Sequence, residues 1–440
     1  METNSAKFQQ GSVDCSKVRH VAEQIFRDYT GGIKIRLWDG TEITLGQAQP
    51  KATIVVNNAE ILRDLAWHPD PLRLAEAYFR GDVDVEGSLY ALLLERTHLQ
   101  SLKLSLKDRI SLFYALLFAG HPSSLAVQSQ ASVRSSQSWK AKLLPHHSKA
   151  HNREAIAFHY DVSNHFYHLW LDDQMVYSCA YFNEPTESID QAQHNKLNHI
   201  CHKLRLKAGE RFLDVGCGWG ALICHAAQHY GVHAHGITLS RKQYEYANAK
   251  IQTLGMEDQV SVELLDYRDL PKGAVFDKVA SIGMFEHVGR KHLPAYFHAV
   301  NSVLKPGGLF LNHGITDKEE GQHKTVAMEF AKRYVFPDGE LDSVSNVQHA
   351  MERIGFEICD VEALRPHYAL TLRHWVSRLE AHRAEALAQV SEAIFRVWRL
   401  YMTACALQFE SGSMGIYQIL AAKQQEGLVD LPLTRRDLYQ

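Results

Sequence analysis

The sequence has few of the features that mark membrane-spanning, disulfide-linked or nucleic-acid-binding proteins. Its longest apolar run, ISLFYALLFAG at 110–120, falls well short of the ~20 residues that a membrane span needs. The seven cysteines are odd in number and form no CxxC pair, which predicts reduced thiols in a cytosol. No basic and then apolar leader opens the sequence, so we expect a cytoplasmic protein. The net charge of −3 does not indicate nucleic acid as a partner.

Metal-binding motifs are also scarce. The 26 histidines include no HExxH pattern, and most of them lie on helix faces that are expected to be exposed. We therefore interpret them as surface residues and expect no metal site. The hydrophobic content of 45% and the charged content of 22% are typical of a globular protein.

The chain of 440 residues is too long for one compact core, and its composition divides it into three parts. Residues 1–120 are predicted to form a small α+β domain associated with lipid or with dimerisation. Its expected strands and helices are 32–40, 52–58, 71–80 and 86–118, with a turn at Asp39–Gly40. Residues 121–150, rich in Ser, Gln, Lys and His, predict a flexible basic linker. Residues 151–440 form the larger part.

A basic segment overlaps the predicted linker. Between Lys103 and Arg153 there are eight Lys and Arg residues and one acid, Asp108. Most such charge runs are solvated loops. The alternative is a patch attracted to an anionic membrane surface, at about 1 kcal/mol per basic residue. The sequence leaves both interpretations open.

Strands and helices alternate in the larger part. The expected strands are 211–215, 233–239, 261–266, 276–283 and 308–315, and the expected helices are 191–205, 220–230, 240–254 and 290–304. Regular alternation predicts an α/β fold with a Rossmann-like, doubly wound parallel sheet that carries helices on both faces. The tail, 367–425, is expected to be mainly helical and to pack on or over the crevice.

The run RFLDVGCGWG at 211–220 is the most informative motif. A buried strand leads directly into three glycines spaced GxGxG, which predicts a loop where the backbone approaches a ligand closely. A dehydrogenase would place an acid at the end of the next strand, where this chain has Thr238. Asp214, just before the first glycine, suits the sulfonium and ammonium of S-adenosylmethionine (SAM). The alternative is that the glycines only permit tight packing of strand and helix.

Seven motifs occur together in a fixed order. They are YSCAYF (177–182), FLDVGCGWG (212–220), GITLSRKQ (236–243), DYRDL (266–270), SIGMFEHVG (281–289), KPGG (305–308) and NHGIT (312–316). Together they resemble the cyclopropane-fatty-acyl-phospholipid synthases and the related mycolic acid cyclopropane synthases, over about 158–425. PLRLAEAYFRGDVDVEG (71–87) resembles, more loosely, the leading domain of the bacterial phospholipid enzymes.

The resemblance implies a class I SAM methyltransferase fold, with 151–440 as the catalytic domain. It implies SAM contacts from Tyr177, Ser178, Phe212, Leu213, Asp214, Val215, Gly216, Cys217, Gly218, Trp219 and Gly220. It also implies that Thr238 and Gln243 reach the ribose side and that Asp266 accepts a hydrogen bond from the adenine amino group.

The family's reaction transfers the SAM methyl group to a cis double bond of an acyl chain in membrane phospholipid, removes a proton and closes a three-membered ring. The carbocation formed on the way requires a dry pocket without nucleophiles. Aromatic faces can stabilise such a cation. The candidates are Phe158, Tyr160, Phe166, Tyr167, Tyr334 and Phe336, although each alone could equally be a core residue.

The resemblance implies that a bound bicarbonate ion acts as the base. The matching positions are Glu286, His313 and Tyr368, with backbone groups of Cys179 and Ile315. Glu286 would accept the bicarbonate O–H while the other two side chains donate to its oxygens. The structural alternative is that Glu286 only caps a helix.

Cys405 matches a late cysteine of the family. It lies in an apolar helix pattern, LYMTACALQFE, where burial raises the pKa of a thiol and makes it inert. We therefore expect Cys405 to be a buried helper and not a nucleophile.

Other outcomes remain open from sequence. The same cation could lose a different proton and give a methylene- or methyl-branched chain. The protein could instead be a small-molecule N-methyltransferase, or a lipid-binding module with a vestigial SAM pocket. For the leading hypothesis we expect a homodimer that associates peripherally with the inner face of the membrane.

Overall fold

The computed structural model describes residues 15–68, 70–95, 111, 114–116, 162–318, 326–336, 339–427 and 431–438. The chain divides into two compact units, one formed by Met1–Ser136 with Ser391–Leu400 and the other by Gln137–Val390 with Tyr401–Gln440. The predicted linker at 121–150 lies outside the described residues, as do Phe158 and Tyr160. The predicted domain boundaries therefore stay a prediction.

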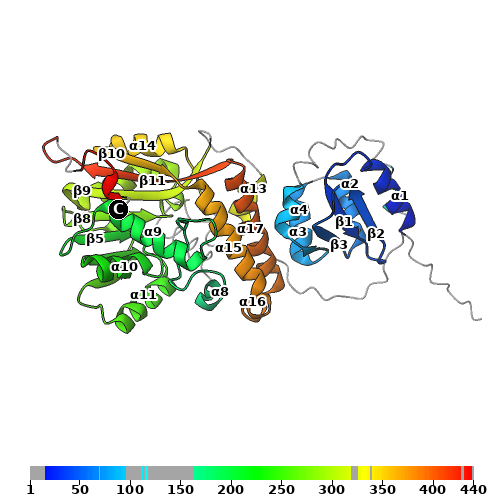
Figure 1. Ribbon diagram of the computed structural model, residues 1–440, viewed down its shortest axis with the longest axis horizontal. Helices are drawn as coiled ribbons and strands as arrows, with labels where there is room; N and C mark the ends of the chain where they lie inside the picture. Colours follow the sequence, from blue (N-terminus) through cyan, green and yellow to red (C-terminus); the bar gives the residue numbers. More distant parts are fainter. Residues whose placement is uncertain are drawn as a thin grey trace, which may run out of the picture. The chain divides into compact units, whose positions relative to one another are not determined.

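The first unit contains a four-stranded sheet in the order β2-β1-β3-β4 (Figure 1). Its strands are β1 (Gly32–Arg36), β2 (Glu42–Gly46), β3 (Ala52–Val56) and β4 (Val83–Gly87), and its helices include α1 (Ser16–Ile25), α2 (Ala59–Trp67), α3 (Pro71–Arg80) and α4 (Leu89–Leu94). Helix α3 has a clear sequence cause, because Asp70 caps its first turn and Gly81 ends it in the left-handed conformation.

The sequence predictions for this unit are partly confirmed. The strands expected at 32–40 and 52–58 correspond to β1 and β3, and the helix at 71–80 is α3. The turn at Asp39–Gly40 leads into β2, which was not expected, and the helix expected from 86 begins only at Leu89 because β4 occupies 83–87. The strand β4 completes the sheet edge by antiparallel pairing with β3.

The second unit contains a seven-stranded sheet in the order β10-β11-β9-β8-β5-β6-β7 (Figure 1). Its strands are β5 (Arg211–Val215), β6 (His233–Thr238), β7 (Val260–Leu264), β8 (Phe276–Ile282), β9 (Leu304–Asp317), β10 (Phe356–Ala363) and β11 (Met414–Lys423). Strands β5 to β9 pair in parallel, which confirms the five predicted strands. Strand β11 lies antiparallel between β9 and β10.

Helices cover both faces of this sheet, as a doubly wound fold requires. The helices from Asn164 onward are α8 (Asn164–His168), α9 (Ile189–Leu204), α10 (Ala221–Tyr230), α11 (Arg241–Leu254), α12 (Leu293–Val303), α13 (Val326–Tyr334), α14 (Val344–Glu352), α15 (Arg365–Ala381), α16 (Arg383–Gln389) and α17 (Glu392–Glu410). The residues of α17 up to Leu400 belong to the first unit. The α/β class is confirmed. The tail is mainly helical as predicted, but it also contributes β11, which was not predicted.

Two hydrophobic cores lie on opposite faces of the sheet. Phe212 packs in a core with residues of α9, α10 and α11. Its neighbours Leu213 and Val215 pack in a second core with residues of α12 and α14. The alternation of side chains along a strand explains this division. It also places Asp214 on the same side of β5 as α9.

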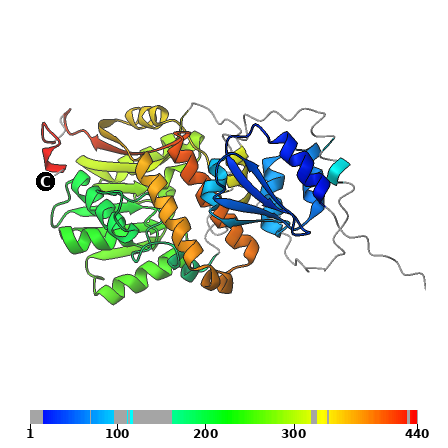
Figure 2. The ribbon, with the colours of Figure 1, turned by 45° about the vertical axis from the view of Figure 1, so that its right-hand side comes forward.

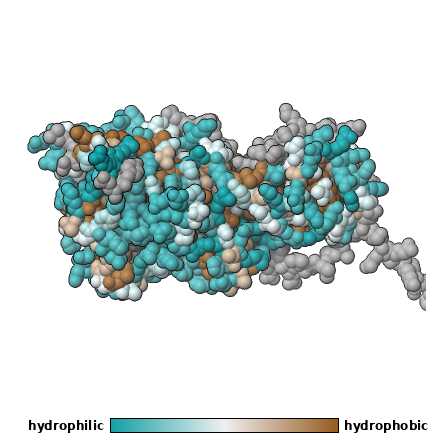
Figure 3. Space-filling view, viewed as in Figure 1, coloured by the Kyte–Doolittle hydropathy of each residue, from teal (hydrophilic) through white to brown (hydrophobic). Residues whose placement is uncertain are grey.

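The carboxyl-terminal helices form a separate group beside the sheet. Turning the view by 45° shows α15 and the later part of α17 running alongside one another (Figure 2). Tyr368 of α15 contacts Phe409 of α17, with 4.7 Å between ring centroids. The face of this unit seen in Figure 3 is largely hydrophilic. No helix in the described ranges is both long and apolar enough to cross a bilayer.

Candidate active site

The glycine loop after β5 opens a cavity at the carboxyl end of the parallel strands. Gly216, Gly218 and Gly220 all have positive φ angles, of 89°, 55° and 84°, which explains why glycine occupies these positions. The amides of Gly216 and Cys217 each donate a 3.0 Å hydrogen bond to the carbonyl of Ile237. The loop is thereby held open at the crevice where doubly wound folds bind ligands.

Asp214 gives this first cavity its charge. The side chain is buried, it lines the cavity, and its Oδ1 has no hydrogen-bond partner among the described residues. Burial raises the pKa of Asp214, while nearby Lys196 opposes the shift. A buried carboxylate oxygen without a partner is costly, so the site favours a ligand that brings positive charge. The ammonium and sulfonium of SAM meet that requirement.

Lys196 of α9 was not singled out from the sequence. It is 2% exposed, and its Nζ donates a 2.9 Å hydrogen bond to Oγ of Ser178. Burial lowers the pKa of Lys196, and the nearby carboxylate of Asp172 opposes this shift. A lysine on a helix is usually solvated, so only the packing of α9 against the segment before it identifies this residue.

The structure brings most of the predicted cofactor residues together. Those that line the first cavity are Tyr177, Ser178, Asp214, Val215, Gly216, Cys217, Gly218, Trp219, Thr238 and Gln243. Thr238 also donates a 2.9 Å hydrogen bond to Oε1 of Gln243.

Four predicted cofactor residues do not line this cavity. Phe212 and Leu213 pack in the two hydrophobic cores. Gly220 forms the amino-terminal cap of α10. Asp266 is buried and is paired with Arg268, whose guanidinium donates to both carboxylate oxygens. Phe212 does not line the cavity because the alternation of side chains along β5 directs it into a hydrophobic core. The Asp266 carboxylate is occupied by its ion pair with Arg268.

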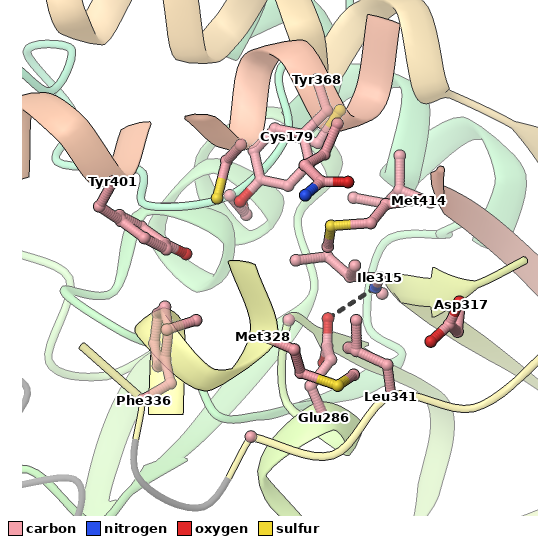
Figure 4. A pocket seen from close by; sticks show the side chains of 18 of the residues that line it. Cys179, Glu286, Ile315, Asp317, Met328, Phe336, Leu341, Tyr368, Tyr401 and Met414 are labelled. Carbon is pink, nitrogen blue, oxygen red and sulfur yellow. Dashed lines mark hydrogen bonds between the residues drawn. The ribbon is translucent and has the colours of Figure 1, made fainter. Parts of the chain in front are cut away.

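A second cavity adjoins the first. The two share Tyr177, Ser178, Ile282, Gly283 and His287 as lining residues. All six predicted catalytic residues line the second cavity: Cys179, Glu286, His313, Ile315, Tyr368 and Cys405. In Figure 4, Tyr368 and Cys179 lie across the cavity from Glu286. Residues from five separate segments of the chain thus converge on one space.

Glu286 lies in a short 3-10 turn, η3 (Phe285–His287), just after β8. Its Oε1 accepts a 2.6 Å hydrogen bond from the amide of Ile315 (Figure 4). The other oxygen, Oε2, is buried without a partner among the described residues. Burial raises the pKa of Glu286 to about 7, although the hydrogen bond from the Ile315 amide lowers it. The carboxylate of Glu286 accepts from an amide of strand β9 and not from the first turn of a helix.

Gly314 permits this arrangement and was not singled out from the sequence. A Cβ at Gly314 would lie 2.1 Å from the Phe285 ring and 2.9 Å from Oε1 of Glu286. Any larger residue would therefore push η3 away from β9. Gly314 is part of the motif NHGIT and stands between His313 and Ile315, two predicted site residues. This position in the sequence could have identified it as a residue of the site.

His313 supplies a buried nitrogen on the same cavity. The side chain is 1% exposed, and burial lowers its pKa well below the usual value, so the imidazole is neutral. Nδ1 lies 3.4 Å from the amide nitrogen of Gln418 on β11, and Nε2 has no partner among the described residues. When the Gln418 amide donates to Nδ1, the imidazole proton is on Nε2. Gln418 was not predicted, because it belongs to the unpredicted strand β11.

The two thiols on the second cavity are protonated. Burial raises the pKa of Cys179 well above its usual value and that of Cys405 to about 12. A neutral thiol is a poor nucleophile. These sulfurs therefore line the cavity without offering reactive electron pairs at neutral pH.

The rest of the second cavity is mainly apolar, although Asp317, Lys332, Gln408 and Ser413 also line it. It is lined by Met328, Phe330, Phe336, Leu341, Tyr401, Ala404, Met414 and Ile416. Of the predicted aromatic residues, Phe336 lines this cavity and contacts the Tyr401 ring, with 5.8 Å between centroids. Phe166 and Tyr167 are completely buried and line neither cavity. Tyr167 supports the site from behind, since it packs against Tyr177 and Trp219.

Comparison with known proteins gives consistent matches. A family model described as mycolic acid cyclopropane synthetase matches residues 147–419, and one described as a domain of unknown function (DUF7884) matches residues 21–104. The chain is 41% identical over 410 residues to a probable fatty acid methyltransferase of Pseudomonas putida, covering 92% of this chain and 96% of that protein.

Two further matches cover the larger part. The chain is 37% identical over 268 residues to the cyclopropane-fatty-acyl-phospholipid synthase of Escherichia coli K12, covering 61% of this chain and 67% of that protein. A crystal structure of mycolic acid cyclopropane synthase CmaA1 complexed with SAH and CTAB aligns with a TM-score of 0.58 and 32% identity, over 62% of this chain and 98% of that chain.

Proposed function

The chain belongs to the mycolic acid cyclopropane synthetase family of SAM-dependent methyltransferases, and on this premise we propose that it methylates a cis double bond in an acyl chain of membrane phospholipid. Proton loss and closure of a cyclopropane ring complete the proposed reaction. The observation that carries the proposal is the junction of two cavities at Tyr177 and Ser178. One cavity presents a carboxylate beside a glycine loop, and the other is mainly apolar and contains Glu286 and His313.

SAM supplies an electrophilic methyl group in this proposal. The Asp214 carboxylate accepts from its positively charged groups, and the glycine loop lets the backbone approach it. Lys196 fixes the Ser178 side chain at the junction through a 2.9 Å hydrogen bond. These residues orient the donor so that its methyl group faces the second cavity.

The second cavity suits a hydrocarbon chain. Phe336, Leu341 and Met414 offer apolar surface, and the thiols of Cys179 and Cys405 are protonated. An alkene is a weak nucleophile, and its attack on the methyl group leaves a carbocation that water or a free thiolate would trap. The Tyr401 and Phe336 rings can stabilise the positive charge without forming a bond to it.

A bicarbonate ion is the proposed base, and two features of the cavity fit such an anion. Oε2 of Glu286 and Nε2 of His313 are buried polar atoms without partners among the described residues. The carboxylate accepts the bicarbonate O–H, and the imidazole N–H donates to an oxygen. Tyr368 lines the same space. The amide of Ile315, assigned to the ion by resemblance, donates to Glu286 in this structure.

The proposal also includes the predicted membrane association and homodimer. Phospholipid is the substrate, so the enzyme must reach acyl chains from a bilayer surface. The basic residues from Lys103 to Arg153, all of them outside the described ranges, are the proposed contact with anionic lipid. Flotation with anionic vesicles tests this association, and sedimentation equilibrium tests the homodimer.

The function is tested with purified protein, SAM, bicarbonate and vesicles of phospholipid with cis-monounsaturated chains. Mass spectrometry should show acyl chains heavier by one CH2 group. Catalytic hydrogenation separates the products, because a methylene-branched chain takes up hydrogen under mild conditions and a cyclopropane does not. If the protein binds SAM and methylates soluble amines, but the acyl chains gain no mass, the protein is an N-methyltransferase and the proposal is wrong.

A further inference from the structure

Three histidines from two packed helices converge outside both cavities. His194 lies on α9, and His225 and His229 lie one turn apart on α10. Each offers a ring nitrogen, and these three nitrogens lie within 4.8 Å of one another. None of the three residues lines either cavity of the active site.

The rings are packed closely against one another. The ring centroids of His225 and His229 are 4.4 Å apart, and those of His194 and His225 are 5.2 Å apart. His225 is 7% exposed, whereas His194 and His229 are exposed. His225 is therefore fixed by burial, whereas His229 and His194 are at the surface, with Nδ1 of His194 3.4 Å from Nδ2 of Asn198.

A neighbouring amide orients the fixed member. Nε2 of His225 lies 2.8 Å from Oδ1 of Asn198, one turn along α9 from His194. When Nε2 donates to this oxygen, Nδ1 carries the free electron pair. Metal-binding histidines commonly donate their other N–H to an oxygen in this way.

We propose that His194, His225 and His229 bind one Zn²⁺ ion, with water in the remaining position. Three imidazoles and a water form a common tetrahedral zinc site, and nitrogen ligands suit this metal. Ligands at zinc distance are roughly 3.4 Å apart, so nitrogens that lie within 4.8 Å of one another must approach by up to about 1.4 Å. Rotation of the exposed His194 and His229 side chains supplies that movement.

The ion would connect two helices that build the SAM cavity. Helix α9 carries Lys196 and Gln193, and both donate hydrogen bonds to Ser178. Helix α10 begins directly after the glycine loop. Zinc would thus stabilise the cavity from outside without touching the reacting groups, which makes the site structural.

The test uses the full chain with any affinity tag removed and with metal stripped by a chelator. Isothermal titration with Zn²⁺ should give one ion per chain, and Zn²⁺ should raise the melting temperature. Co²⁺ should bind with the visible absorption of a tetrahedral nitrogen and oxygen site. His194→Gln and His229→Gln should each weaken binding at least tenfold, and Asn198→Ala by roughly 10–100-fold.

The matched control is His298→Gln, which removes an exposed histidine of α12 and should leave zinc binding unchanged. The two exposed ligand histidines are the decisive variants, because a variant of buried His225 could fail for lack of folding. The proposal is overturned if the wild-type chain binds no zinc. It is equally overturned if both variants bind like wild type, or if Co²⁺ shows the charge-transfer band of a thiolate ligand.

Discussion

The amide of Ile315 donates a 2.6 Å hydrogen bond to Oε1 of Glu286, which leaves Oε2 as the carboxylate oxygen without a partner among the described residues. The bond fixes the orientation of the side chain, and Gly314 leaves the room that it needs. A buried acid held at one oxygen and available at the other can accept a proton or an O–H donor at a defined point.

Replacing this acid tests its role. Glu286→Gln keeps the shape but removes the negative charge, so kcat should fall by roughly a hundredfold to ten-thousandfold. The dissociation constant for SAM, measured by calorimetry, should change little because Glu286 does not line the first cavity. Loss of SAM binding together with activity would instead indicate a structural role for Glu286.

The pH dependence follows from the raised pKa of Glu286. The folded-state pKa is about 7, and the accepting form is the carboxylate. We therefore expect kcat/KM to rise as pH increases through about 7 and then to level off. The measurement uses vesicles at a constant bicarbonate concentration. Glu286→Gln should lack this rise, and a wild-type profile that falls over the same range would contradict the assignment.

The free energy of unfolding should fall as pH rises through the same range, because it depends on the protonated form of Glu286. The pKa of Glu286 is raised from 4.5 in the unfolded chain to about 7 in the folded state, so the folded state binds more protons between these values. The stabilising contribution of the protonated acid is complete below pH 4.5 and is lost as pH rises through about 7. Urea unfolding should show Glu286→Gln becoming more stable relative to wild type above neutral pH.

The glycine loop can be tested with a matched pair of variants. Gly216→Ala places a Cβ 3.1 Å from Cγ of Met284 at a φ of 89°, so SAM affinity should fall sharply. Gly209→Ala imposes similar strain at a φ of 80°, but its Cβ meets nothing within 4 Å. Each should lose about 1–2 kcal/mol of stability. Equal SAM affinity in the two variants would show that close approach at Gly216 is unimportant.

The apolar part of the second cavity is the proposed acyl site. Leu341→Asp places a carboxylate among apolar side chains there, so the KM for phospholipid vesicles should rise by roughly tenfold or more. SAM binding should persist. Leu254→Asp, at a residue of α11 that is 46% exposed, is the control and should behave like wild type. An unchanged KM in the Leu341 variant would place the acyl chain elsewhere.

Cys405 should be dispensable for the chemistry. Its thiol is protonated at neutral pH, since burial raises its pKa to about 12, and methyl transfer to an alkene needs no covalent enzyme intermediate. Cys405→Ala should retain most of its kcat in the vesicle assay. A loss as large as that of Glu286→Gln would assign a chemical role to the thiol.

The glycine loop could be predicted because local sequence encodes it, whereas the residues that converge on the second cavity were predicted from the family resemblance. Asp214 lies in a buried strand that Gly216 follows, Glu286 comes soon after the end of β8, and His313 of β9 pairs with Ile282, the last residue of β8. Strand ends of a parallel sheet meet at one edge, so motifs far apart in sequence are brought to one crevice.

Features set by long-range packing could not be predicted. Strand β11 follows a long helix and is defined by its pairing with β9 and β10, and strand formation depends strongly on such context. Lys196 has the pattern of a solvated helix residue until α9 packs over the Ser178 segment. His225 was interpreted as a surface residue and is buried because α10 packs against α9.

The most direct test of the proposed reaction follows the methyl carbon itself. The enzyme is incubated with SAM labelled with carbon-13 in its methyl group, bicarbonate and unsaturated phospholipid vesicles, and the extracted lipid is examined by NMR. The proposal predicts that the label becomes a ring CH2 bonded to two adjacent acyl-chain carbons. A label found as a methyl group on nitrogen or oxygen, or remaining entirely in SAM, would contradict it.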